Sequence, residues 1–129
     1  MLVLPAGIGI YLATEPISMR NSIDGLCAYV EKHFTHLELY QGHLFVFLSR
    51  SRERAKLLYF ERGGFVVYYK RLERARFRRP LLEAGARSCT LTPAELASLL
   101  EGIDLSGARR QKLWQGPLRA PLDKSLSFR

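Results

Sequence analysis

The chain has 129 residues and a formal net charge of +8, and 47% of its residues are hydrophobic and 25% are charged. This composition excludes a fibrous or largely disordered chain, and the length is sufficient for one domain with a hydrophobic core. The positive charge favours acidic partners, with nucleic acid first and an anionic membrane or an acidic protein after it.

The first part of the sequence predicts a strand followed by a helix. Residues 9–14, "GIYLAT", have strand character, and Pro16 ends that pattern. Residues 22–34 predict a helix with one buried face, because apolar residues recur there at helical spacing. These apolar residues are Ile23, Leu26, Cys27, Val30 and Phe34.

Three strand-like runs follow, at residues 43–49, 55–61 and 65–72, and all are rich in β-branched and aromatic residues. Gly63 and Gly64 lie between the last two runs, where a hairpin turn requires the positive φ that glycine adopts at low cost. The segment "RSRER" joins the first two runs and would place its arginines in an exposed turn. We therefore expect an antiparallel meander.

The last predicted helix has the clearest local signature. Thr92 is placed to be its N-cap, Pro93 occupies the first helical position, and Glu95 completes a capping box. These residues predict a helix over 93–101, which Gly102 can end.

Together these elements predict an α+β fold. We expect an antiparallel β-meander of about four strands, packed against two amphipathic helices. Residues 1–107 would form this single domain. Residues 108–129 contain six basic residues and one acidic residue, with Gly, Pro and Ser among them, and predict a flexible basic C-terminal tail.

The two cysteines and the chain start indicate the compartment. Cys27 and Cys89 lack the spacing of a disulfide framework, so we interpret them as reduced core residues. The apolar N-terminus has no basic n-region, which argues against a signal peptide, and no apolar window is long enough to span a membrane. We expect a cytoplasmic protein without a membrane partner.

One 30-residue block carries the whole excess of positive charge. Residues 50–79 contain eleven Lys and Arg and three acidic residues, whereas the other 99 residues contain nine of each. Whether residues 71–78 continue as a strand or turn helical, cations line up on one side. Rows of cations suit a phosphate backbone, because each neutralised phosphate releases counterions and arginine matches phosphate oxygens in pairs. The predicted nucleic-acid-binding residues are Arg50, Arg52, Arg54, Lys56, Lys70, Arg71, Arg74, Arg76 and Arg78.

Aromatic residues adjoin this block, and bases of a single strand can stack on such side chains. Aromatic residues of strands more often belong to the core. Tyr68 or Tyr69 is the best candidate for contact with a base, because one of the two faces outward in a regular strand.

The sequence predicts neither a metal site nor a cofactor. His33, His36 and His43, with Cys27 and Cys89, are the available ligands, and they do not form a four-ligand set at metal-binding spacing. The carboxylates are scattered, which argues against the convergent set of a two-metal nuclease. We predict that the protein is not an enzyme. Metal-independent RNA cleavage by Arg and Tyr is a less favoured alternative that rests on fold analogy alone.

Several segments resemble one known family in their order and spacing. They are residues 19–26 ("MRNSIDGL"), 42–60, 64–77 and 91–104 ("LTPAELASLLEGID"). They are similar to the small accessory protein, of the TnpB type, that is encoded beside the transposase in the insertion sequence sixty-six family. The resemblance covers about residues 1–105. It implies a bacterial, transposon-encoded protein that assists a separate transposase.

Charge and resemblance together predict a non-catalytic accessory protein of transposition. It would bind the DNA backbone, at transposon ends or nonspecifically, and help to assemble the transposase complex. The alternative hypothesis is an adaptor whose basic face contacts an acidic surface of the transposase without binding DNA.

Overall fold

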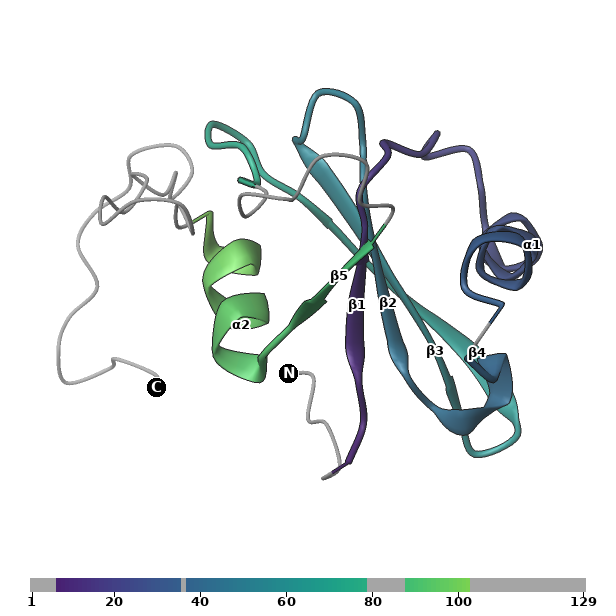
Figure 1. The fold of residues 1–129 in the computed structure, drawn as a ribbon. Helices are drawn as coiled ribbons and strands as arrows, with labels where there is room; N and C mark the ends of the chain where they lie inside the picture. The colour runs from purple at the N-terminus through teal and green to yellow at the C-terminus, as the bar shows by residue number, and fades with distance from the viewer. Residues whose placement is uncertain (1–6, 36, 79–87, 103–129) are drawn as a thin grey trace, which may run out of the picture.

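The structure is a computed structural model that describes residues 7–35, 37–78 and 88–102. Figure 1 shows a sheet that lies between two helices. In chain order the elements are β1 (Ile10–Ala13), α1 (Ile23–His33), the short 3-10 helix η1 (Leu39–Gln41), β2 (Leu44–Leu48), β3 (Arg54–Glu61), β4 (Gly64–Arg71), β5 (Ser88–Leu91) and α2 (Pro93–Glu101).

The α+β class is confirmed, and the sheet differs in detail from the predicted one. It has five strands in the order β4-β3-β2-β1-β5. The meander β2-β3-β4 is antiparallel as predicted, but β1 runs parallel to β2. The parallel pair arises because the chain leaves β1, passes through α1 and returns to begin β2 at the same end of the sheet.

The sequence did not predict β5. It pairs antiparallel with β1, from Ile10 opposite Leu91 to Ala13 opposite Ser88. The strand has only four residues, and three of them are Ser, Cys and Thr. Its local sequence carries no strong strand signal, so its conformation depends on the pairing with β1.

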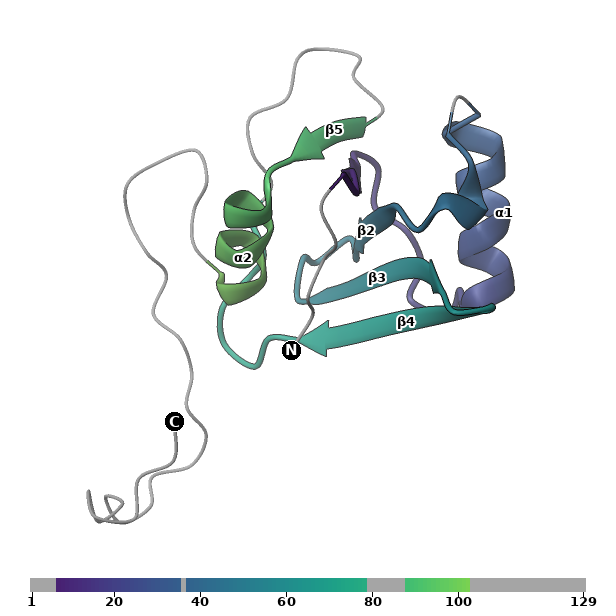
Figure 2. The ribbon, with the colours of Figure 1, turned by 90° about the horizontal axis from the view of Figure 1, so that it is seen from below.

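Each face of the sheet buries its own hydrophobic cluster beneath one helix. Leu44, Val46 and Leu48 of β2 belong to the cluster on the α2 side, and Phe45 and Phe47 to the cluster on the α1 side. Figure 2 shows the two helices on opposite sides of the sheet. Because β2 is buried on both faces, its sequence is a continuous apolar run without alternation.

The β3–β4 hairpin closes with a two-residue turn. Glu61 pairs with Gly64, and Arg62 (φ 50°) and Gly63 (φ 85°) lie between them. A two-residue hairpin turn whose twist matches that of the flanking strands (type I′) requires positive φ at both central residues. Gly63 takes the predicted conformation, whereas the second left-handed position belongs to Arg62 and not to Gly64.

The predicted termini of α2 are confirmed. The Thr92 hydroxyl accepts a hydrogen bond from the Glu95 amide at 3.1 Å, and the Thr92 amide donates to the Glu95 carboxylate at 2.9 Å. Gly102 ends the helix in the left-handed region at φ 82°. These contacts satisfy backbone groups that a helix end leaves without intrahelical partners.

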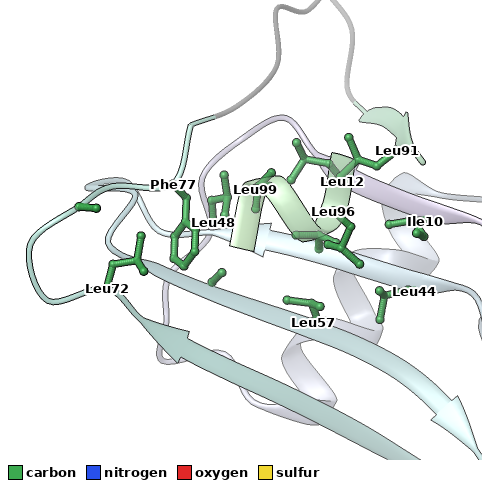
Figure 3. Close-up of a cluster of buried hydrophobic side chains, with 13 residues drawn as sticks. Ile10, Leu12, Leu44, Leu48, Leu57, Leu72, Phe77, Leu91, Leu96 and Leu99 are labelled. Atoms are coloured by element: carbon green, nitrogen blue, oxygen red, sulfur yellow. The ribbon is translucent and has the colours of Figure 1, made fainter. Parts of the chain in front are cut away.

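Residues 72–78 continue neither as a strand nor as a helix, in contrast to both geometries considered from the sequence. Leu72, Ala75 and Phe77 are buried in the cluster on the α2 side. Figure 3 shows Phe77 close to Leu48, with Leu99 nearby. The segment therefore packs its apolar residues inward and leaves its arginines outside.

The proposed boundary between the domain and the tail stays a prediction. Residues 103–129 lie outside the described residues.

Candidate nucleic-acid interface

Two basic segments that are separate in the sequence meet at one end of the sheet. The Leu72 amide donates to the carbonyl of Glu53 at 2.8 Å, and the Phe77 amide donates to the carbonyl of Arg52 at 2.7 Å. Residues 72–78 are thereby fastened to the turn that joins β2 and β3. This end of the sheet is at the top of Figure 1.

A third segment, residues 14–21, lies at the same end because β1 ends there in parallel with β2. The Ile17 amide donates to the carbonyl of Leu48 at 3.0 Å. We call the surface formed by residues 14–21, 49–54 and 72–78 the basic end. It contains seven arginines and three glutamates, so positive charge prevails there.

A groove lies between residues 14–21 and residues 49–54 of the basic end. It has a volume of about 510 Å³ and is open to solvent. Its lining consists of Pro16, Ile17, Ser18, Met19, Ser49, Arg50, Ser51 and Arg54. A smaller hollow of about 30 Å³ adjoins it and is lined in part by Glu15 and Arg52.

Two of the nine predicted binding residues have other partners inside the domain. The Lys56 side chain is only 8% exposed, and its ammonium donates to the carbonyls of Met19 and Asn21. The Lys70 ammonium donates to the carbonyl of Leu100 at 2.7 Å, in the last turn of α2. A cation is favourable there because the C-terminal end of a helix carries partial negative charge.

Arg71 is exposed and paired with an acid. Its guanidinium lies 2.7 Å from a carboxylate oxygen of Glu73. The hydrogen bond to Glu73 and its negative charge raise the pKa of Arg71. The pair reduces the positive charge that Arg71 presents to a ligand.

The arginines of the β2–β3 turn are in a different situation. Arg50 and Arg54 are exposed and Arg52 is partly exposed. Among the residues that the structure describes, no carboxylate forms an ion pair with any of these three guanidinium groups. Arg52 adopts φ 62°, a conformation that is uncommon for residues other than glycine.

Arg74, Arg76 and Arg78 are exposed along the segment that packs beside this turn. The buried residues Ala75 and Phe77 alternate with them, so the packing of the segment directs these arginines toward solvent. The structure thus brings six of the nine predicted residues to the basic end as exposed or partly exposed side chains.

The sequence prediction missed Arg20 and the serines of the groove. Arg20 is exposed in the third segment of the basic end. Serines alternate with the arginines in "SRSR" at 49–52, which is a local signal for additional hydrogen-bond donors. Nothing in the sequence places residues 14–21 beside them, because that contact depends on the parallel pairing of β1 and β2.

Both candidate stacking residues are exposed. Tyr68 is 37% exposed and Tyr69 52% exposed, because β4 is an edge strand of the sheet. They lie on opposite faces, since Tyr68 is opposite Leu57 and Tyr69 is opposite Lys56 in the register. The Lys56 ammonium is 5.0 Å from the centre of the Tyr69 ring.

The described histidines that were considered as metal ligands contact other groups of the domain. The Gly9 amide donates to Nδ1 of His43 at 3.0 Å, and the His33 ring lies 4.2 Å from that of Tyr29. His36 lies outside the described residues. Over residues 7–35, 37–78 and 88–102, no group of three or more His, Cys, Asp or Glu could hold a metal ion. In the same ranges, no helix has the length and apolarity that crossing a membrane demands.

Sequence comparison places the chain among the proteins encoded by insertion sequences. It belongs to the IS66 Orf2-like protein family, whose model matches residues 8–110. The uncharacterized protein y4hO of Sinorhizobium fredii is 36% identical over 104 residues, which cover 79% of this chain and 88% of that protein. The uncharacterized protein y4jC of the same organism is 30% identical over 105 residues, which cover 81% and 87%. No solved structure gives a significant match. The resemblance read from the sequence is confirmed.

Proposed function

We propose that this protein is a non-catalytic accessory factor of transposition that binds the DNA backbone through the basic end. It acts in the bacterial cytoplasm together with the transposase of its element, and it helps to assemble the complex of transposase and DNA. Family membership supports the association with an insertion sequence. The contact with DNA is inferred from the positive charge of the basic end.

The observation that carries the proposal is the convergence at the basic end. Hydrogen bonds from Leu72 and Phe77 hold residues 72–78 against the β2–β3 turn. Arginines from positions about 25 residues apart in the sequence therefore form one surface. Closely spaced cations of this kind bind phosphates irrespective of base sequence, since contacts to phosphate position a protein and do not read the bases.

The proposed phosphate contacts are Arg50, Arg52, Arg54, Arg74, Arg76 and Arg78. Lys56 and Lys70 are left out of the proposed set because their ammonium groups donate to backbone carbonyls, and Arg71 is left out because Glu73 offsets its charge. The described helices argue against base readout by a helix in the major groove. Their exposed faces carry Asp24 and Glu31 on α1 and Glu101 on α2.

A binding titration tests this function. The purified protein is titrated with duplex carrying a transposon end and with unrelated duplex, each with and without the transposase. We expect similar affinity for both duplexes without transposase. The affinity should fall as the salt concentration rises, with a log-log slope of several units.

Arg74→Glu with Arg76→Glu should lower both the affinity and the slope, whereas Arg62→Glu, at the opposite end of the sheet, should change them little. A protein that captures its transposase but binds no DNA at about 50 mM salt would establish the adaptor hypothesis instead.

The opposite end of the sheet supports the contact with a protein partner. The rings of Tyr40, Phe60 and Phe65 lie 5.1 to 5.4 Å apart, centre to centre, and Tyr40 is 62% exposed. Exposed aromatic residues are enriched at protein interfaces. Tyr40→Asp should weaken co-purification with the transposase and leave DNA binding by the protein alone unchanged. Unchanged co-purification would remove this end from the proposal.

A further inference from the structure

We propose that the groove between residues 16–19 and the β2–β3 turn is a phosphate-binding subsite that holds one phosphodiester of the bound nucleic acid. This inference rests on the proposed function and adds to it a defined position for the backbone. Arg50 and Arg54 would supply the positive charge, and the Ser51 hydroxyl would supply a neutral hydrogen-bond donor.

The electrostatics of the groove favour an anion. Both of its charged lining residues, Arg50 and Arg54, are arginines, and no acidic residue lines it. The nearest acids in sequence are Glu53, whose side chain is exposed in the turn, and Glu15, which lines the smaller adjoining hollow. Two guanidinium groups beside one opening suit a phosphate, because each offers several N–H donors in a plane.

The serines of the turn form a chain of hydrogen bonds that leads toward the groove. The Arg54 amide donates to the Ser49 hydroxyl at 3.1 Å, and the Ser49 hydroxyl is 3.4 Å from that of Ser51. Either hydroxyl can donate to the other. When Ser49 donates to Ser51, the Ser51 hydrogen is left for an acceptor in the groove.

The backbone around the groove is held in place before any ligand binds. The Arg52 amide donates to the carbonyl of Ser49 at 2.9 Å, and the Ser49 amide donates to the carbonyl of Arg54 at 2.9 Å. The other segment of the groove is held by the hydrogen bond that the Ile17 amide donates to the carbonyl of Leu48, at the end of β2. A turn fastened in this way loses less entropy on binding than a mobile loop does.

The apolar part of the lining suits the remainder of a nucleotide. Pro16, Ile17 and Met19 line one wall, opposite the turn arginines. A phosphodiester in the groove would direct its charged oxygens to the arginines and its sugar carbons to this wall. The groove therefore matches a backbone phosphate with flanking sugars better than it matches a free inorganic ion.

The test combines two probes with matched variants. Amide chemical shifts of the ¹⁵N-labelled protein are followed during titration with inorganic phosphate and, separately, with a short duplex. We expect both probes to change the amide chemical shifts of residues 17–19 and 49–54, and the duplex to bind more tightly.

Arg50→Ala and Arg54→Ala should each weaken duplex binding about tenfold. Arg62→Ala, which also removes an exposed turn arginine, should have little effect. Arg54→Lys keeps the charge and should recover only part of the affinity.

The outcomes separate this inference from the proposed function. If the duplex binds but Arg50→Ala and Arg54→Ala weaken it no more than Arg62→Ala, the subsite is wrong and the function stands. If phosphate shifts the groove residues but no duplex binds, the groove binds anions, and both its assignment to a phosphodiester and the proposed function are wrong. Shifts spread evenly over the surface with both probes would overturn the subsite. Thermal unfolding of each variant shows whether it is folded.

Discussion

The ammonium nitrogen of Lys56 lies 2.7 Å from the carbonyl oxygen of Asn21 and 2.9 Å from that of Met19. It joins the middle of the sheet to the chain just before α1. We predict that Lys56→Met lowers the free energy of unfolding by about 1–3 kcal/mol, because two carbonyls lose a charged donor. Urea denaturation measures the change, and the affinity of the folded variant for DNA should stay close to that of the wild type.

Lys32→Met is the matched control, since Lys32 is exposed in the last turn of α1. It removes the same charge and should cost only a few tenths of a kcal/mol through the helix dipole. Equal destabilisation by the two substitutions would contradict a structural role for Lys56. A large loss of DNA affinity in Lys56→Met alone would restore Lys56 to the binding surface.

The capping box of α2 gives a second prediction. Thr92→Ala removes the hydroxyl that accepts from the Glu95 amide, and we expect a loss of about 1 kcal/mol in the free energy of unfolding. Thr92→Ser keeps the acceptor and should lose much less. If both variants have the same urea midpoint, the cap makes no contribution to stability.

Phe77 links the core to the basic end. Its ring is fully buried and its amide donates to the backbone carbonyl of Arg52. Phe77→Ala should cost about 3–5 kcal/mol, a large part of the stability of a small domain. Phe77→Leu should cost less, because it leaves a smaller cavity.

Phe77→Leu also tests the position of residues 72–78. Since the backbone hydrogen bond to Arg52 is retained, the folded variant should bind DNA with nearly wild-type affinity. A folded Phe77→Leu protein with a strongly reduced DNA affinity would show that the ring, and not only the backbone contact, positions the arginines.

The concentration of arginines predicts opposite effects of salt on stability and on binding. Like charges at the basic end repel one another, and salt screens this repulsion. Raising sodium chloride from about 20 to about 200 mM should therefore increase the melting temperature while it weakens DNA binding. In Arg50→Ala/Arg54→Ala the increase in melting temperature should be smaller. A wild-type melting temperature that falls over this range would argue against repulsion at the basic end.

The two cysteines predict a loss of stability at alkaline pH. Burial raises the pKa of the Cys27 and Cys89 thiols above the ordinary value of 9.0, and nearby carboxylates add to the effect. As the pH rises through that ordinary value, the unfolded chain loses thiol protons that the folded chain retains. The free energy of unfolding therefore decreases there. Between about pH 8 and about pH 10, Cys89→Ala should show a smaller decrease than the wild type. Parallel curves would contradict the prediction.

The elements with strong local signals were predictable from the sequence. The capping box at Thr92 and the positive φ at Gly63 depend on residues within a few positions, and both are present in the structure. The parallel pairing of β1 and the position of β5 were not predictable in this way. Both depend on hydrogen bonds between residues more than 30 positions apart, which leave no periodic pattern in the local sequence.

The basic composition of the candidate site could be predicted from the sequence, but the set of side chains that forms its exposed surface could not. The basic block stands out by its charge, yet no local pattern indicates that Lys56 and Lys70 direct their charges to backbone carbonyls. Lysines on strands alternate between faces, and whether a helix covers that face is a matter of tertiary packing. Arg20 was missed for the same reason, because residues 14–21 reach the turn only through the crossover from β1. The turn serines have a local signal in "SRSR", but their position beside a groove depends on the same contact.

The hydrogen bonds from Leu72 and Phe77 to the β2–β3 turn also couple DNA binding to folding. In the unfolded chain the arginines of residues 50–79 are spread along a flexible segment, and their close spacing exists only once both contacts have formed. A polyanion that binds the assembled surface more tightly than the open chain shifts the folding equilibrium by mass action. The amount of folded protein would then depend on the concentration of its ligand, so the protein would persist longest where it is bound.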